Sequence, residues 1–182
     1  SLLDTLLMVG VASAIAVIIG IPLGVTLTVT ARGNMLENQP VNHVLGAIIN
    51  ATRSVPFVIL MVAIIPFTWL VAQTSIGTTA AIVPLSVAAI PFMARIAENA
   101  MREVDPGLIT AARAMGASPM QIIMKVLLPE ALPGLIAATI VTVVSLIGYS
   151  AMAGAIGGGG LGDLGIRYGY QRFLPEVMVA VV

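Results

Sequence analysis

The sequence predicts an all-α membrane protein, a polytopic bundle of transmembrane helices, and three observations carry this prediction. Of the 182 residues, 59% are hydrophobic and only 9% are charged, whereas a soluble domain has roughly 45–50% and about 25%. The mean hydropathy is +1.08. The apolar stretches are continuous and only 4% of residues are aromatic, which excludes the alternating strands and aromatic girdles of a membrane barrel. Helices are therefore expected to cross the bilayer.

The composition also excludes other classes of protein. The low charge and high apolarity are the opposite of a disordered chain. There is no cysteine, and hence no disulfide, thiolate nucleophile or cysteine metal site. The net charge is zero without a run of like charges, so nucleic acid is not expected as a partner. Because the sequence starts at Ser1 and its last apolar run stops at Val182, we expect residues 1–182 to be an excerpt that forms one domain.

Charge-free windows place the spans, since each needs about 20 apolar residues. The first span is expected at 5–27. The window 54–94 has room for two, and its polar stretch 73–79 divides a second span at 55–72 from a third at 80–96. A fourth is expected at 135–155, and 176–182 is interpreted as the start of a fifth. In the first span, Gly20 and Gly24 have the spacing that lets another helix approach closely.

The positions of the basic residues indicate the orientation in the membrane. With the N-terminus outside, six basic residues fall in inner segments and only Arg167 and Arg172 in outer ones. The six are Arg32, Arg53, Arg95, Arg102, Arg113 and Lys125. This distribution favours an outer N-terminus, and a fifth span would return the C-terminus to the cytoplasm. Prolines within or beside the spans predict kinks that serve either packing or hinge motion.

The longest inner segment, 98–130, has the signals of two short helices. Asp105 followed by Pro106 is typical of an N-cap and first helical position. Gly116 is suited to a left-handed C-terminal stop. Ser118, Pro119 and Gln121 predict a second start with a capping box, and Pro129 is expected to end that helix near Leu128. A hairpin that is too short and too polar to span is expected to contact something outside the bilayer.

One spacing in this segment resembles a known family. Thr110-Ala111-Ala112, three residues, Gly116, nine residues and Val126-Leu127-Leu128-Pro129 resemble the EAA loop of ABC importer membrane subunits. That family has Glu-Ala-Ala, three residues, Gly, nine residues and Ile-x-Leu-Pro, so this chain departs at Thr110 and Val126. The resemblance implies that this loop couples the chain to an ATPase. The residues implied are Thr110, Ala111, Ala112, Arg113, Gly116, Ser118, Val126, Leu128 and Pro129.

Other segments narrow the resemblance to the methionine-importer permeases. They are 53–57, 65–68, 114–121, 149–154 and 159–162, and together the matches cover nearly the whole sequence. The resemblance implies a five-helix, type I importer subunit in a bacterial inner membrane that pairs with a second copy. Two cytoplasmic ABC ATPase subunits and an extracytoplasmic methionine-binding protein would complete the transporter for D- and L-methionine. ATP and Mg²⁺ would be held by the ATPase, and this chain would bind no cofactor. A permease for another amino acid or small metabolite is the alternative.

The chain has little that points to an enzyme. The glycines of 157–162 formally fit G-x-G-x-x-G but follow a helical span rather than a strand, so we expect a flexible or close-packed outer loop. No G-x-x-x-x-G-K-[ST] sequence occurs, so ATP hydrolysis is expected of another subunit. His43 is interpreted as an interfacial polar residue, no metal site is expected, and carboxylates are expected only at span ends. An intramembrane enzyme is therefore a distant alternative.

A candidate translocation path follows from the fourth span. Tyr149, Ser150 and Met152 lie toward its outer half among small residues. Met152 offers a flexible, polarizable side chain that could close the outer end of the path, and the other reading is ordinary packing. Since this segment has no charge, we expect it to hold a zwitterion only weakly, with selectivity resting on the external binding protein.

Overall fold

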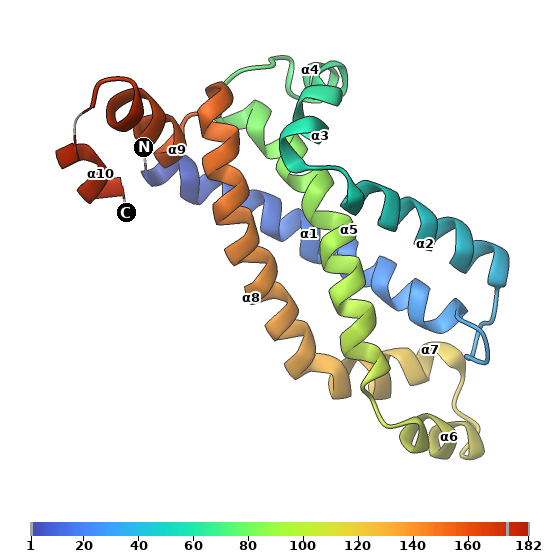
Figure 1. Cartoon of the computed structure of the whole chain (residues 1–182). Coiled ribbons are helices and arrows are strands. Elements are labelled where there is room, and N and C mark those ends of the chain that lie inside the picture. The colour runs from blue at the N-terminus through green and yellow to red at the C-terminus, as the bar shows by residue number, and fades with distance from the viewer. Residues whose placement is uncertain (1, 174, 182) are drawn as a thin grey trace. The chain divides into compact units, whose positions relative to one another are not determined.

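The computed structural model describes residues 2–173 and 175–181, and these form helices joined by short turns, with no strand among them (Figure 1). The all-α prediction is confirmed. The helices, in chain order, are α1 (Leu2–Thr30), α2 (Gln39–Ser54), α3 (Phe57–Ala63), α4 (Ile65–Ala72), α5 (Thr78–Arg102), α6 (Pro106–Ala114), α7 (Pro119–Ile122), α8 (Leu128–Ala153), α9 (Gly160–Leu164) and α10 (Pro175–Val181). Three π-helical turns lie between them: η1 (Ile123–Leu127), η2 (Gly154–Gly158) and η3 (Gly165–Tyr170).

The chain divides into two compact units. The first comprises Ser1–Ile15, Val55–Ala89 and Thr142–Val182. The second comprises Ala16–Ser54 and Ile90–Val141, and it contains α2, the 98–130 segment and one part each of α1, α5 and α8.

Three helical stretches of the described residues are long and apolar enough to cross a membrane: Leu2–Thr30, Thr78–Arg102 and Pro119–Gly158. They confirm the first, third and fourth expected spans. A fourth crossing is obtained if α2 and α3, which a sharp bend separates, are counted as one broken span. The expected start of a fifth span coincides with α10, while Val182 lies outside the described residues.

The second expected span was wrong as a single helix over 55–72. The chain forms α3 and α4 instead, with a break at Ile64 (φ −98°, ψ 14°). Pro66 explains the break, because it has no N–H to donate and its ring clashes with the carbonyl four residues earlier. Near the start of α4 a proline is tolerated. At about 1.5 Å per residue, neither α3 nor α4 is long enough to span alone.

A 16-residue helix that was not expected from the sequence, α2, lies between the first two expected spans. Within the second unit, Ile49 of α2 packs against Leu27 of α1 and Ala94 of α5. The Asn42 side-chain amide donates to the Leu27 carbonyl at 2.7 Å and to the Thr30 hydroxyl at 3.1 Å. These contacts hold α2 against the C-terminal part of α1.

Glycines allow the C-terminal parts of α1 and α5 to approach closely in the second unit. A Cβ at Gly20 would lie 2.8 Å from the Met93 Cβ, and one at Gly24 would lie 2.8 Å from the Ala94 carbonyl oxygen. Real Cβ atoms do not approach other atoms so closely. The expected close approach at Gly20 and Gly24 is therefore confirmed, and α5 is the helix that approaches.

The glycine segment after α8 is close-packed within the first unit. A Cβ at Gly154 would lie 2.6 Å from the Gly159 carbonyl oxygen, and one at Gly160 would lie 2.6 Å from the Thr5 hydroxyl oxygen. The Leu161 N–H donates to that hydroxyl at 2.9 Å. Gly159 has φ 77° and ψ −157°, a backbone conformation open essentially only to glycine. The segment thus packs as a tight turn, one of the two expectations for it.

The close approach of α1 and α5 predicts that alanine destabilises the protein at Gly24 but not at Gly10. Gly24→Ala should lower the apparent midpoint of thermal unfolding in detergent, because the added methyl forces a backbone shift that costs about 1–3 kcal/mol. Gly10→Ala in the same helix is the matched control, since a Cβ there meets nothing within 4 Å and alanine favours helix. Equal midpoints for the two variants would contradict the close packing.

Candidate functional site

The first helix of the 98–130 segment is fixed by its N-cap. The Gly107 N–H donates to Asp105 Oδ1 at 2.8 Å, and Pro106 takes the first helical position of α6. The proline has a fixed φ and needs no N–H partner there. The N-cap predicted at Asp105 is confirmed, and α6 therefore begins at a defined residue.

Gly116 ends this first helix as predicted. Its φ is +79°, the left-handed conformation that glycine adopts at low cost. The Gly116 N–H donates to the Arg113 carbonyl at 2.9 Å, and the Ala117 N–H donates to the Ala112 carbonyl at 3.1 Å. This pair of bonds is the Schellman motif, which satisfies the last carbonyls of a helix. A Cβ at Gly116 would meet nothing within 4 Å, so its backbone conformation alone requires glycine.

The second helix begins with the predicted capping box. The Gln121 N–H donates to the Ser118 hydroxyl at 3.3 Å, and the Ser118 N–H donates to Gln121 Oε1 at 2.9 Å. These two bonds satisfy N–H groups that have no carbonyl partner at the start of a helix, so a new helix begins soon after Gly116. Figure 1 shows α6 lying beside α7.

The prediction that Pro129 ends the second helix was wrong. The helix continues from α7 through the π-helical turn η1 into α8, as one stretch from Pro119 to Gly158. The Leu128 N–H reaches back to the Ile123 carbonyl, five residues earlier. This wider turn accommodates Pro129, which cannot make the ordinary bond to Lys125. The loop is therefore joined to the following span without a break.

The structure brings the predicted coupling residues together in one segment of the second unit but places them on two faces. Ala112 is buried, and Val126 and Leu128 are half-buried. Ile123 and Leu127 pack into the core of this unit. The remaining predicted residues are exposed: Thr110, Ala111, Arg113, Gly116, Ser118 and Pro129.

Four exposed apolar side chains lie in the same segment and were not singled out from the sequence. They are Leu108, Met115, Met120 and Met124, with exposed fractions of 41%, 82%, 66% and 58%. Thr110, which stands where the related family has glutamate, donates its hydroxyl to the Pro106 carbonyl at 3.0 Å. The exposed surface of this loop thus includes four large apolar side chains beside charged ones such as Arg113 and Lys125. The methionines on either side of Gly116 in the sequence could have indicated this exposed apolar group.

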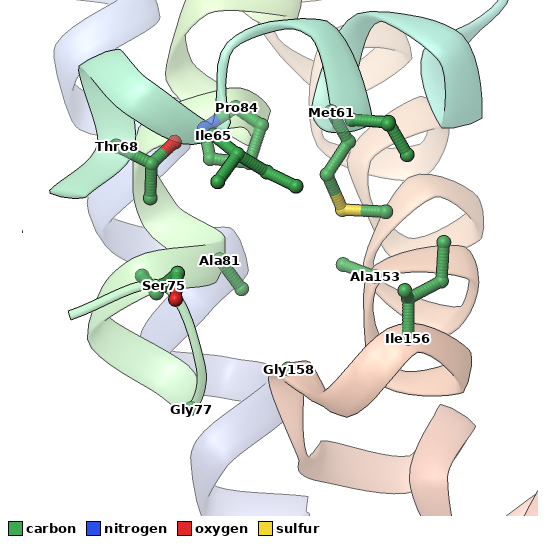
Figure 2. Close-up of a pocket in the computed structure, with 12 residues that line it drawn as sticks. Met61, Ile65, Thr68, Ser75, Gly77, Ala81, Pro84, Ala153, Ile156 and Gly158 are labelled. Atoms are coloured by element: carbon green, nitrogen blue, oxygen red, sulfur yellow. The ribbon is translucent and has the colours of Figure 1, made fainter.

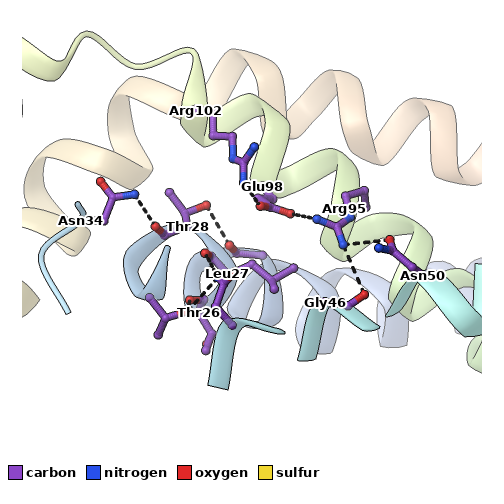
Figure 3. A network of polar contacts seen from close by, with 12 residues as sticks. Thr26, Leu27, Thr28, Asn34, Gly46, Asn50, Arg95, Glu98 and Arg102 are labelled. Carbon is purple, nitrogen blue, oxygen red and sulfur yellow. Dashed lines mark hydrogen bonds and ion pairs between the residues drawn. The ribbon is translucent and has the colours of Figure 1, made fainter. Parts of the chain in front are cut away.

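A charged network lies in the second unit beside this loop (Figure 3). Glu98 is 1% exposed, and it accepts from Arg95 at 2.5 Å and from Arg102 at 2.6 Å. Arg95 also donates to Asn50 Oδ1 at 2.9 Å and contacts the Gly46 carbonyl at 3.5 Å. The network thereby ties α5 to α2. Glu98 was expected from the sequence only as a carboxylate at a span end, and its buried ion pairs were not predicted.

The three predicted path residues all belong to the first unit but do not share one environment. Tyr149 is half-buried and stacks on Phe57, with ring centroids 4.9 Å apart. Ser150 is buried and donates to the Ile147 carbonyl at 2.7 Å. Ser150 and the 47%-exposed Met152 both line a groove of about 760 Å³ between α8 and the α9–α10 segment.

A second, smaller cavity of about 70 Å³ also lies in the first unit. In Figure 2, Met61, Ala153 and Ile156 lie on one side of it and Thr68 and Ser75 on the other. Thr68 is 4% exposed, and its hydroxyl has no hydrogen-bond partner among the described residues. This cavity is too small for an amino acid, since ligand pockets are typically about 300–1,000 Å³.

The described residues contain no group of three or more His, Cys, Asp or Glu side chains placed to hold a metal ion. His43 is exposed, and its ring Nδ1 lies 2.9 Å from the Gln39 carbonyl oxygen. It therefore contacts its own helix, as an interfacial polar residue would.

Comparisons with known proteins place the chain in a family. A family model described as the binding-protein-dependent transport system inner membrane component matches residues 7–182. The probable D-methionine transport system permease protein MetI of Vibrio cholerae is 57% identical over 98% of this chain and 80% of its own length. The Pasteurella multocida protein of the same name is 55% identical over 100% of this chain and 87% of its own.

A solved structure gives the same result. It shows inward-facing conformations of the MetNI methionine ABC transporter, with a TM-score of 0.97 and 52% identity, and covers 100% of this chain and 84% of the solved chain. The long apolar helices of the present chain accord with an inner membrane component that crosses the bilayer several times. The chain belongs to the family of inner membrane components of binding-protein-dependent transport systems.

Proposed function

We propose that this chain is the permease subunit of an ATP-driven importer that carries D- and L-methionine across the bacterial inner membrane. The observation that carries the proposal is the capped hairpin 105–129. Its exposed apolar side chains can pack against a cytoplasmic partner. The names of the relatives and the 0.97 TM-score to a methionine ABC transporter support the substrate. Another amino acid or small metabolite is the alternative substrate.

The assembly we propose has two copies of this chain, two cytoplasmic ATPase subunits and an extracytoplasmic methionine-binding protein. ATP and Mg²⁺ belong to the ATPase subunits. When ATP closes the ATPase pair, the exposed face of α6 and α7 moves with it. Because α7 runs through η1 into α8 without a break, that movement is transmitted directly to the spanning helix.

The groove lined by Ser150 and Met152 is proposed as part of the translocation path in the outer half of the bundle. Its lining is mostly apolar and includes Thr5 and Ser150. A flexible methionine side chain such as Met152 adapts to a changing gap more readily than a branched one. In this proposal Met152 and its counterpart in the second copy close the outer end of the path.

Reconstitution tests the proposed function. Proteoliposomes that contain the complete transporter and its binding protein should accumulate radiolabelled methionine only when ATP is supplied to the ATPase side. A complex whose ATPase nucleotide pocket is disabled is the control and should accumulate none. If another amino acid is taken up while methionine is not, the alternative substrate holds. Uptake without ATP would reject an ATP-driven importer.

We also propose that the N-terminus lies outside and the C-terminus in the cytoplasm. The absence of cysteine from the sequence allows single-cysteine labelling at exposed sites. Ser75→Cys, between α4 and α5, should react with an impermeant thiol reagent added outside intact cells. Glu103→Cys, between α5 and α6, should react only after the cytoplasmic side is opened. The reverse pattern would require the opposite orientation.

Gly116 tests the coupling role of the loop. Gly116→Val should lower methionine uptake per ATP hydrolysed, because a β-branched residue reaches φ +79° only at a cost of about 1–2 kcal/mol. Gly116→Asn is the matched control, since asparagine tolerates this conformation and nothing lies within 4 Å of the new Cβ. Both complexes should assemble. A Val variant with the normal ratio of uptake to hydrolysis would remove the loop from the coupling mechanism.

A further inference from the structure

Arg53 does not lie in the inner loop where the sequence analysis counted it. It stands at the C-terminal end of α2, fourteen residues after Gln39 begins the helix, which corresponds to a rise of about 21 Å at 1.5 Å per residue. Its position therefore differs from that of Arg32, which remains in the short connection between α1 and α2. The bias of basic residues that favours an outer N-terminus persists without Arg53.

The register of α2 against α5, within the second unit, gives the depth of Arg53. Asn50 pairs with Arg95, and one turn further along α2 the Arg53 guanidinium lies over the Phe92 ring, 5.9 Å from its centroid. Phe92 precedes Arg102, the end of α5, by ten residues, or about 15 Å. Measured from that end, this is about half of a hydrocarbon core roughly 30 Å thick.

A cation at this depth needs an explanation. Ionisable residues far inside a membrane are costly and are usually functional. Arg53 is exposed on the chain; among the described residues it has no ion pair or hydrogen bond, and its guanidinium lies over the Phe92 ring. Glu98, the buried carboxylate of this unit, is already bound by Arg95 and Arg102. The guanidinium donors of Arg53 are therefore free for an anion.

The backbone beside Arg53 supplies hydrogen-bond acceptors, the carbonyl oxygens at the end of α2. The last carbonyls of a helix have no intrahelical donor, and α2 ends at Ser54, two residues before Pro56, which has no N–H. The Ser54 hydroxyl donates to the Ala51 carbonyl at 2.7 Å, which accounts for one of them. Interrupted helices of this kind are where transporters bind ions and small zwitterions.

We propose that Arg53 binds the α-carboxylate of the amino-acid substrate midway through the membrane. Phe92 holds the guanidinium by a cation–π contact, and the last carbonyls of α2 accept from the substrate ammonium. The inference rests on the proposed function and deepens it. It differs from the expectation for the uncharged segment at 149–152, because in this proposal each copy also brings one cation. A lipid phosphate is about half a hydrocarbon core away and is not the expected anion.

The first test compares methionine uptake by reconstituted transporters with and without a positive charge at position 53. Arg53→Gln should lower methionine uptake about tenfold or more, as expected for the loss of a charged hydrogen bond. Hydrolysis stimulated by the loaded binding protein should stay within about twofold of the unmodified complex. Arg53→Lys should retain part of the uptake, because lysine keeps the charge without the bidentate geometry. The matched control is Arg172→Gln, which removes an arginine that also lies over an aromatic ring, Tyr168 at 4.9 Å, and should leave uptake unchanged.

A chemical rescue covers the case in which the Gln variant fails to fold. Arg53→Cys complexes are purified and treated either with a thiol reagent that attaches an ethylammonium group or with one that attaches a neutral methylthio group. The cation should restore uptake, and the neutral group should not. The complex with unmodified Arg53, treated in parallel, controls for cysteines of the other subunits.

The outcomes separate the two proposals. Absence of methionine uptake by the unmodified transporter rejects the proposed function. Normal uptake by Arg53→Gln, or equal rescue of Arg53→Cys by the charged and neutral reagents, overturns the role of Arg53 while leaving the proposed function standing. A parallel fall of uptake and stimulated hydrolysis in Arg53→Gln also overturns it, since it would indicate a structural role.

Discussion

The whole fold depends on one constraint: inside hydrocarbon, every backbone N–H and C=O must be satisfied by the protein itself. This chain has eleven prolines and eighteen glycines. It meets the constraint through local changes in its helices, such as side-chain hydrogen bonds to backbone carbonyls and a widened turn. The Thr26 hydroxyl donates to the Pro22 carbonyl at 2.8 Å and the Thr28 hydroxyl donates to the Gly24 carbonyl at 2.9 Å. Where Pro129 removes a donor, a π-helical turn replaces the ordinary one. The same constraint thus produces both the continuous α7–α8 stretch and the interrupted helices.

The buried network of the second unit satisfies the same constraint for charges. An isolated carboxylate with the burial of Glu98 would cost several kcal/mol. Two guanidiniums surround it, and one of them, from Arg95, extends to Asn50 and Gly46. Without these guanidiniums Glu98 would be a buried, unpaired carboxylate, which is far more costly than the net gain from the pairs. The network therefore fixes the register of α2 on α5, and that register places Arg53 over Phe92.

The features that could be predicted from the sequence are those determined by neighbouring residues. Asp105, Gly116 and Ser118 each act through bonds to residues no more than five positions away, so composition and spacing suffice to place them. The helix α2 depends instead on distant partners, such as Ile49 against Ala94. A search for charge-free windows finds helices that face lipid, whereas α2 carries Asn42, His43, Asn50 and Arg53. Asn42 and Asn50 find their hydrogen-bond partners on α1 and α5, and the residues next to them in the sequence do not indicate such distant partners.

Pro129 shows a different limit of local rules. The rule that proline ends a helix assumes the ordinary turn, and it holds at Pro66, where α4 begins anew after the break. At Pro129 the preceding turn widens instead, while Ile123 and Leu127 stay anchored in the core. Whether a proline breaks or widens the helix thus depends on the packing of the preceding turn, which the sequence does not display.

The substitution of Thr110 for the glutamate of related loops has a physical consequence for docking. The Thr110 hydroxyl is occupied by the Pro106 carbonyl, so this position offers no charge and no free donor to a partner. In the proposed docking, the exposed side chains of Leu108, Met115, Met120 and Met124 offer apolar area that a partner can bury. Methionine side chains repack at low cost, which suits a surface that must stay attached while the partner changes shape. A charged contact at position 110 would be more directional than these apolar ones, so the change from glutamate to threonine shifts the proposed docking toward contacts that tolerate movement.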